Sequence, residues 1–365
     1  MLTFSPTEEQ EEIRQLAQSL AVEQFRLRGR PSEKDGDISP ALTQTLAQTG
    51  LTVPFPEEYG GQGAIEAVPY VLIAEEFSVG DSTLALNVLS SLIAPVTVAL
   101  AGSESQRQAL IPAFTDEKTG HTLRGSFAFA ERTGGYMLSD IAATARKDGD
   151  NYILNGTKRD VIHAGHATLR VALFRLEGTN GLDGLCAFVL PGHADGMCVS
   201  DDVQKLGLIA APSASYSFEN VVVSASALLG EPGNAGVQRT AALYMLLRAG
   251  IACGIARASL EYARDYASGR TAFGRPIASY QGIAFMVAEM AMKLDAARLL
   301  VWNAAFNWDQ NAETTLLIQS AEAAQKQALK IAKSASIDSI QVLGGAGYLQ
   351  DHPVEMWTRN AAAMD

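Results

Sequence analysis

The pattern of hydrophobic and polar residues divides the chain into three zones. Residues 1–120 show helical spacing, for example between Leu16 and Leu20. Residues 121–228 change to short apolar or alternating runs that are separated by turn residues. Residues 229–365 return to helical spacing. The pattern therefore predicts an α+β protein with an N-terminal helical domain, a central β domain and a C-terminal helical domain.

The first zone carries clear signals for where its helices begin and are interrupted. Ser5 can cap a helix, Pro6 suits its first turn, and the acidic residues that follow suit the positive end of the helix dipole. The run PFPEEYGGQG at Pro54–Gly63 predicts a loop, because two prolines and three glycines break regular structure. Apolar helical segments are expected from Ala67 to about Ala101.

The middle zone predicts a compact arrangement of short strands. Turn residues such as Asp148-Gly149 and Asn155-Gly156 separate the runs. Short strands at this density are typical of a β-barrel or a sandwich. The expected strands are Ser126–Ala130, Ile141–Ala145, Tyr152–Asn155, Leu169–Phe174, Leu185–Leu190 and Ser215–Val223.

The last zone predicts a helical bundle. A second helix is expected over the alanine-rich stretch Gln319–Ala335. Apolar residues that step by four and three positions form the seam of one bundle helix: Ile283, Val287, Met290, Leu294, Ala297 and Val301.

Composition and charge exclude some classes of function. The 365 residues are 47% hydrophobic, so the chain can bury a large core. Forty acidic residues against 28 Lys and Arg give a formal charge of −12, which argues against nucleic-acid binding but allows a local patch for an anionic small ligand. A GxGxxG fingerprint after a strand and a GxxxxGK[ST] loop are both absent from the sequence, which disfavours Rossmann-type and P-loop nucleotide sites.

Cysteine and histidine usage predicts neither disulfides nor a metal centre. Cys186, Cys198 and Cys253 fit no zinc spacing and indicate a reducing compartment. His163 and His166 lie three residues apart without a third ligand nearby, so no metal is expected. No membrane span and no signal peptide are recognised, and we expect a cytoplasmic protein.

Two long motifs, together with shorter flanking ones in the same order, resemble the acyl-CoA dehydrogenase family. They are RTAFGRPIASYQGIAFMVAEM at residues 270–290 and QVLGGAGYLQDHPVEMWTR at 341–359, and the flanking pieces include TVPFPEEYGGQG at 52–63 and YILNGTK at 152–158. The resemblance covers nearly the whole chain. It implies an N-terminal helical domain, a central β-barrel-like domain and a C-terminal four-helix bundle.

The resemblance also implies a chemistry, a cofactor and an assembly. In this family a carboxylate removes the α-proton of an acyl-CoA or other acyl thioester, while the β-hydrogen leaves as hydride to the flavin. FAD lies at a subunit interface of a tetramer: the β domain of one subunit grips the flavin ring, and the bundle of the neighbour holds the adenosine and phosphates. The expected partners are therefore the acyl thioester and a homologous subunit in a homo- or hetero-tetramer.

The bundle half of this FAD site is matched residue by residue. Arg270 is expected to face the pyrophosphate, because a guanidinium suits phosphate oxygens. Phe273 is expected near the adenine end, and Gln281 is expected to hydrogen-bond the cofactor. The remaining cofactor-binding residues implied are Gln341, Gly344 and Gly345, the glycines because the backbone must come close to the diphosphate.

The flavin-gripping half departs from the family pattern T-E-P-x-x-G-S-D and N-G-x-K-x-W-I-T. Ala130 stands at the place of the Thr and has no hydroxyl to donate. Arg132 replaces the Pro, and Tyr136 falls near the small Ser. Asp160 replaces the aromatic residue, and Ile162 replaces the second hydroxyl. A shifted alignment, with Ser139 or His163 as ligands, is the alternative to a lost flavin grip.

The catalytic base of the family is also not found. Its usual place, in a segment like Y-E-G-T, would follow Asp365. A minority of members carry the base on the bundle helix before the R-x-x-F-G motif, and that register places Tyr244 there, whose phenol is a poor base at neutral pH. Glu355 corresponds to a structural acid of the family. The catalytic residue is therefore left unassigned.

A loss on one side only suggests a division of labour between unlike chains. Heteromeric members of the family occur among actinobacterial steroid- and lipid-degrading enzymes. Our hypothesis is that this chain completes the FAD site of a homologous partner in an α2β2 assembly. The alternatives are an acyl-CoA dehydrogenase that is active alone, a non-catalytic partner subunit, and a flavin oxidase or monooxygenase of the same fold.

Overall fold

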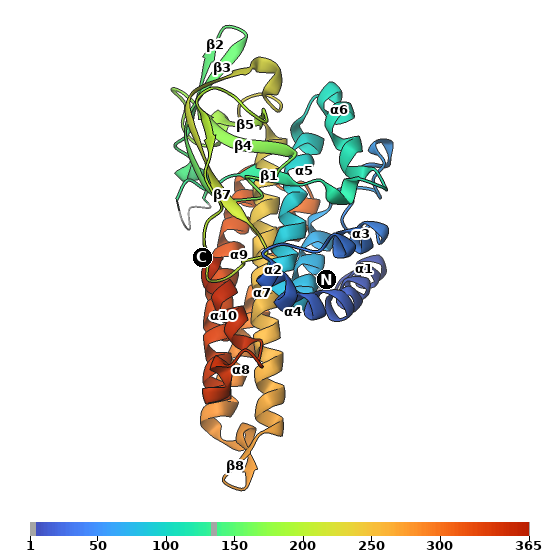
Figure 1. The fold of residues 1–365 in the computed structure, drawn as a ribbon, viewed down its shortest axis with the longest axis vertical. Coiled ribbons are helices and arrows are strands. Elements are labelled where there is room, and N and C mark those ends of the chain that lie inside the picture. Colours follow the sequence, from blue (N-terminus) through green and yellow to red (C-terminus); the bar gives the residue numbers. More distant parts are fainter. Residues whose placement is uncertain (1–4, 133–136, 365) are drawn as a thin grey trace.

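The computed structural model describes residues 5–132 and 137–364. A long helical bundle forms the axis of the molecule, with the curled sheet packed against one end and the N-terminal helices along one side (Figure 1). At the opposite end of the bundle a small hairpin, β8 (Thr271–Ala272) and β9 (Arg275–Pro276), projects beyond the helices (Figure 1). We call this end of the bundle, with the hairpin and the adjoining helix ends, the bundle tip.

The N-terminal region is helical, as predicted, although its first helix begins later than expected. Thr7, and not Ser5, is the N-cap: its hydroxyl accepts from the Gln10 amide, and the Gln10 side chain accepts from the Thr7 amide. This reciprocal pair satisfies two amides that would otherwise lack partners. The helices are α1 (Glu8–Leu20), which continues through a π-helical turn (Ala21–Phe25) into α2 (Arg26–Asp35), α3 (Pro40–Gln48), α4 (Ala67–Ser91), α5 (Ile93–Ala101) and α6 (Glu104–Thr115).

Helix α4 is interrupted at Asp81, whose backbone is extended (φ −158°, ψ 119°). The Asp81 carboxylate accepts the Leu84 amide at 2.9 Å, so it caps the second half of the helix. Gly29 of α2 approaches this carboxylate so closely that a Cβ there would lie 2.3 Å from Oδ2. Because Asp81 is buried, its pKa is raised to about 6.

The middle region forms a curled sheet in the order β1–β4–β2–β3–β7–β6, with β5 paired to the other strands through β4. β1 and β2 run parallel to β4, and the other pairs are antiparallel. Bulges between Leu154 and Gly156, and between Lys158 and Val161, bend β3 along β7. The strands are β1 (Gly125–Ala128), β2 (Thr144–Asp148), β3 (Asn151–Ile162), β4 (Leu169–Leu176), β5 (Leu185–Leu190), β6 (Met197–Val199) and β7 (Ser213–Ser224).

Most of the predicted strands are present with shifted boundaries. The prediction at Ile141–Ala145 was shifted, because the strand begins only at Thr144 and ends at Asp148. Strand β3 extends seven residues beyond the expected end at Asn155, and its Gly156 takes part in a bulge (φ 132°) where a turn was expected. The short β6 and the β8–β9 hairpin were not predicted, because two- and three-residue strands leave no periodic signal.

The bundle consists of α7 (Ala235–Gly269), α8 (Gln281–Asp309) and α9 (Thr314–Leu343), followed by α10 (Val354–Ala363). Asn234 caps α7 by accepting the amides of Gly236 and Val237. The predicted seam is confirmed in its deepest part, since Met290, Leu294, Ala297 and Val301 are buried. At Gly254 of α7 an added Cβ would lie 2.5 Å from the Glu75 carbonyl, so only glycine allows α4 to pack this closely.

Two apolar helical stretches form the centre of the molecule. Ala67–Ala101 and Ala235–Gly269 are long and apolar enough to cross a membrane by length and composition alone. In the fold, 89% and 94% of their most apolar windows are buried. This burial is the behaviour of core helices, and their side chains join the main hydrophobic cluster.

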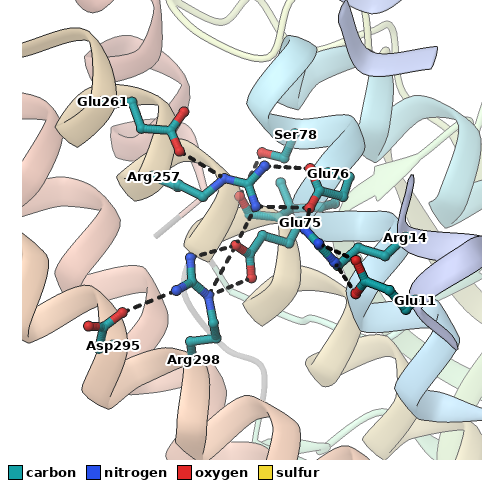
Figure 2. A network of polar contacts seen from close by, with 10 residues as sticks. Glu11, Arg14, Glu75, Glu76, Ser78, Arg257, Glu261, Asp295 and Arg298 are labelled. Atoms are coloured by element: carbon teal, nitrogen blue, oxygen red, sulfur yellow. Dashed lines mark hydrogen bonds and ion pairs between the residues drawn. The ribbon is translucent and has the colours of Figure 1, made fainter. Parts of the chain in front are cut away.

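A network of charged side chains ties α1, α4, α7 and α8 together inside this helical body (Figure 2). The Arg257 guanidinium of α7 binds Glu75 at 3.1 Å and also Glu76, both on α4. Arg298 of α8 binds Glu75 at 2.8 Å, and Arg14 of α1 binds Glu76 at 3.1 Å. Each carboxylate of the buried pair Glu75–Glu76 thus meets two guanidinium groups, which offset the cost of burying the two acids.

Candidate functional site

The six cofactor-binding residues predicted from the motifs all lie at the bundle tip. Arg270 caps the end of α7, Phe273 is in the β8–β9 turn, and Gln281 begins α8. Helices α8 and α9 have 29 and 30 residues and are joined by the short segment 310–313, so the end of α9 lies level with the start of α8. Gln341 is in the last turn of α9, and Gly344 and Gly345 begin the 3-10 helix Gly344–Tyr348.

All six residues are exposed, which is the placement that contact with another molecule requires. Phe273 exposes 96% of its surface. Within the described part of the chain, the Arg270 guanidinium has no carboxylate partner. A Cβ added at Gly344 or Gly345 would meet no atom within 4 Å, so the backbone at both positions is open to a ligand. A guanidinium, a carboxamide and open backbone amides are a donor set that suits a diphosphate.

In the second half of the expected site, in the β domain, the polar groups of Ala130 and Glu131 bond to other groups of the same domain. Ala130 is buried, and its carbonyl accepts the Arg159 amide at 2.8 Å. The Glu131 carboxylate accepts the Ala142 and Ala143 amides and binds the buried Lys158 ammonium at 2.6 Å. Burial lowers the pKa of Lys158 to about 8, against the attraction of Glu131.

The residues that follow Glu131 hold the other expected departures and one of the alternative ligands. Arg132 binds Asp140 at 2.7 Å, whereas Tyr136 lies outside the described residues. Of the alternative ligands, Ser139 is exposed in the short 3-10 helix Leu138–Asp140. His163 is buried, and its Nε2 lies 2.8 Å from the Asn87 carbonyl. Burial lowers the pKa of His163 to about 4, so the ring is neutral at pH 7.

A cavity of about 530 Å³ lies between β3, α7 and α10, where the resemblance places the flavin ring. Asp160 and Ile162 of β3, the two residues that depart from the family pattern, form part of its wall. Arg248 of α7 forms another part of the wall and donates a hydrogen bond to the Met364 carbonyl. Lys205 also lines the cavity, and burial lowers its pKa to about 8. Volume therefore does not exclude a flavin ring, and the wall departs from the family pattern at Asp160 and Ile162.

The structure places no carboxylate at Tyr244, where a minority of family members carry the base, and it agrees with a structural role for Glu355. Tyr244 is buried, with its ring 5.5 Å from the Phe127 ring and 6.3 Å from the Phe129 ring. Burial alone would raise the pKa of Glu355, but hydrogen bonds from Arg359 and Arg30 outweigh burial and lower it. Glu355 is thus an ion-paired structural acid. Among the described residues that line the cavity, Asp160 alone carries a carboxylate.

The sequence did not predict the braced hairpin at the tip, nor the two basic residues in the wall of the cavity. Tyr280 and Arg275 brace the hairpin at the tip, with the Arg275 guanidinium 4.1 Å from the Tyr280 ring. The only signal for the hairpin was the Phe-Gly pair, because glycine is the residue that most readily takes a left-handed conformation. Lys205 and Arg248 come from separate elements, and no local spacing connects them to the cavity.

The comparisons with known proteins agree along the whole chain. Family models of the acyl-CoA dehydrogenase N-terminal, middle and C-terminal domains match residues 7–118, 126–221 and 233–365. The probable acyl-CoA dehydrogenase FadE25 of Mycobacterium tuberculosis is 31% identical over 98% of this chain and 91% of its own length. An acyl-CoA dehydrogenase of Bacillus subtilis is 33% identical over 97% of this chain and 93% of its own length.

Solved structures show the same fold. Butyryl-CoA dehydrogenase from Megasphaera elsdenii superposes with a TM-score of 0.85 at 26% identity, covering 100% of this chain and 95% of that one. This agreement confirms the α+β architecture of N-terminal helices, curled β domain and C-terminal bundle that the sequence predicted. The chain belongs to the acyl-CoA dehydrogenase family of enzymes.

Proposed function

We propose that this chain takes part in flavin-dependent α,β-dehydrogenation of an acyl-CoA thioester as the FAD-completing subunit of a heteromeric enzyme. Its bundle tip would hold the adenosine and diphosphate of an FAD whose flavin ring lies in the β domain of a homologous, unlike chain. The acyl-CoA class is supported by family membership and by relatives such as butyryl-CoA dehydrogenase.

One observation carries the proposal. The bundle half of the expected FAD site keeps the residues of the family pattern and exposes them, whereas the β-domain half departs from that pattern. The tip residues Arg270, Phe273 and Gln281 are exposed, and Arg270 has no carboxylate partner in the described part of the chain. In the β domain, Ala130 is buried and Asp160 lines the cavity. Asp160 stands where the family pattern has an aromatic residue, and Ala130 has no hydroxyl to offer the flavin ring. The chain thus keeps the family's residues for the nucleotide end of FAD and departs from those for the flavin ring.

This difference sets what the residues of this chain would do. FAD, when bound, supplies the hydride acceptor of the reaction. Arg270 would bind the diphosphate oxygens, and Gln281 would orient the cofactor by a hydrogen bond. The open backbone at Gly344 and Gly345 would let the phosphates approach. Proton abstraction from the substrate is assigned to the partner chain.

The surface of α8 supports an assembly with another chain. Large apolar side chains recur every seven residues along its exposed face: Phe285, Met292, Leu299 and Phe306, with exposed fractions of 65%, 66%, 45% and 48%. A repeat of seven keeps these side chains on one side of the helix, as in helices that pack against a second helix. A stripe of this kind is expected at a subunit interface rather than in contact with water.

Expression of the chain alone and together with its homologous genomic neighbour tests the proposal. We expect acyl-CoA-dependent reduction of an electron-accepting dye only from the co-expressed pair, because the base position on α7 holds Tyr244 and not a carboxylate. Butyryl-CoA is a suitable first substrate. Activity of the lone chain at the level of the pair would contradict the proposal, and so would a failure of the two chains to copurify.

A further inference from the structure

The hairpin at the bundle tip holds a conformation that the chain would not favour on its own. β8 and β9 pair Thr271 with Pro276 and Ala272 with Arg275, joined by the two-residue turn Phe273-Gly274. Both turn residues have positive φ, 52° and 83°, as in a type I′ turn. Phenylalanine disfavours this left-handed region, and a two-stranded hairpin of this size is not stable by itself. Another part of the protein must therefore hold it.

Tyr280 is the residue in position to do so. Its hydroxyl donates to the Ala272 carbonyl at 3.1 Å, so it holds the first strand. Its ring lies 4.1 Å from the Arg275 guanidinium, so it holds the second strand through a cation–π contact. Both strands of the hairpin are thereby attached to one side chain.

Tyr280 is itself fixed to the start of α8. Its amide donates to the Ile277 carbonyl at 3.1 Å, and its carbonyl accepts the Ile283 and Ala284 amides at 3.0 and 2.9 Å. The Ile277 amide in turn donates to the Arg270 carbonyl at 2.9 Å, which closes the base of the hairpin. The brace therefore links the segment that carries Arg270 to the residue directly before Gln281.

We call Arg270, Phe273 and Gln281 at the bundle tip the FAD clamp. From this geometry we propose that Tyr280 is a positioning residue of the FAD clamp. It holds the hairpin so that Arg270, Phe273 and Gln281 have their binding arrangement before the cofactor arrives. The inference rests on the proposed function, since it assigns a role to Tyr280 in the same clamp. A preformed clamp loses less conformational freedom on binding, so weakening the brace should mainly speed the release of FAD.

The test uses the FAD-loaded assembly of this chain with its partner. FAD release after dilution is followed by the rise in flavin fluorescence, for the wild type, Tyr280→Phe and Tyr280→Leu. Tyr280→Phe removes one neutral hydrogen bond and should speed release about three- to tenfold. Tyr280→Leu also removes the cation–π contact and should speed release by about tenfold or more. Tyr59→Phe is the matched control, because its hydroxyl binds Glu104 on the N-terminal helices, and it should not change the rate.

Two further experiments separate a positioning role from general damage to the fold. The thermal midpoint of the lone chain should stay within about 1 °C of the wild type in both Tyr280 variants, because Thr271–Pro276, all of them described, include no member of the main hydrophobic cluster. In a Phe273→Ala background, Tyr280→Leu should have a smaller effect than in the wild type, because the two residues act through one hairpin.

The outcomes distinguish this inference from the proposed function. If Arg270→Gln speeds release while both Tyr280 variants release FAD at the wild-type rate, the role of Tyr280 is wrong and the clamp stands. If Arg270→Gln also leaves release unchanged, the clamp and the brace are both wrong. Faster release in the Tyr280 variants with a coupled Phe273 effect supports the inference.

Discussion

Helix α7 and its C-cap carry two arginines with opposite surroundings. Arg257, in the middle of the helix, is surrounded by Glu75, Glu76 and Glu261 (Figure 2). Arg270, thirteen residues later at the helix end, is exposed and meets no carboxylate within the described residues. An arginine enclosed by acids stabilises the fold, whereas one held out in solvent beside open glycines is available to a ligand. The interior network and the bundle tip thus separate stability from binding along one helix.

The largest expected effect comes from breaking the interior network. Arg257→Met removes the cation that binds both Glu75 and Glu76 and leaves two buried carboxylates short of a partner. We expect the free energy of unfolding to fall by about 3–5 kcal/mol, measured by urea denaturation of the lone chain. Arg264→Met is the control, because Arg264 is exposed and should change stability by less than about 0.5 kcal/mol. Equal stability of the two variants would mean that the network does not hold α4 to α7.

Removing the charge of Arg270 at the tip should weaken FAD binding and leave the stability of the fold almost unchanged. Arg270→Gln should leave the free energy of unfolding within about 0.5 kcal/mol of the wild type, because the Arg270 guanidinium is exposed and has no carboxylate partner among the described residues. It should weaken FAD binding by the assembly by about 1.5–3 kcal/mol, or roughly 10- to 150-fold, the value of a hydrogen bond to a charged group. Titration of the apo-assembly with FAD measures this. Arg146→Gln, an exposed arginine in the β domain, should leave FAD affinity unchanged.

Asp81 is a buried acid without the two arginine contacts of Glu76, so the two residues should respond differently to loss of their charge. Burial raises the pKa of Asp81 to about 6 from 3.8, so between those pH values the folded protein holds a proton that the unfolded chain releases. Stability should therefore fall as pH rises from about 4 to 6, by at most about 3 kcal/mol. Asp81→Asn keeps the cap of α4 and removes the charge, and it should raise stability at pH 7 by about 1–3 kcal/mol.

The check on Asp81 is the difference in unfolding free energy between the two proteins as a function of pH. The Asp81→Asn variant should gain over the wild type above pH 6 and approach it near pH 4. A gain that is constant across this range would show that the charge of Asp81 is not its origin. Glu76→Gln should not show such a gain, because Glu76 already has two arginine partners.

The smallest of the predicted effects is expected at the turn of the hairpin. Phe273→Asn creates Asn-Gly, the pair most favoured in a type I′ turn, and removes a strained phenylalanine. The lone chain should become more stable by at most about 1 kcal/mol, seen as a small rise in the thermal midpoint. The assembly should nevertheless lose FAD affinity, because the exposed ring is gone. If FAD affinity is retained, Phe273 does not belong to the clamp.

The sequence predicted the architecture because periodicity reports burial along each element. The seam from Met290 to Val301 and the change to short runs after residue 121 both reflect which side chains face the core. Local signals were weaker: Thr7 rather than Ser5 caps α1, because the reciprocal bond with Gln10 decides the start. The boundary of β2 was missed because Ile141 and Ala143 are buried without belonging to a strand.

Long-range features could not be predicted from local pattern. Glu75 and Arg257 are 182 positions apart, and no spacing rule joins them. The same holds for the cavity, whose wall takes Asp160 from β3, Lys205 from a loop and Arg248 from α7. The motifs named the tip residues, but their shared exposure depends on the equal lengths of α8 and α9, which only the structure shows.

The amount of bound FAD per polypeptide tests whether this chain contributes only to the FAD site of a partner chain. The lone chain and the co-purified pair would be denatured, and the released FAD would be measured by absorbance against the amount of each chain. A clamp that serves only the partner's β domain predicts no bound FAD in the lone chain and one FAD for every two polypeptides in the pair. One FAD for every copy of the lone chain would contradict the account.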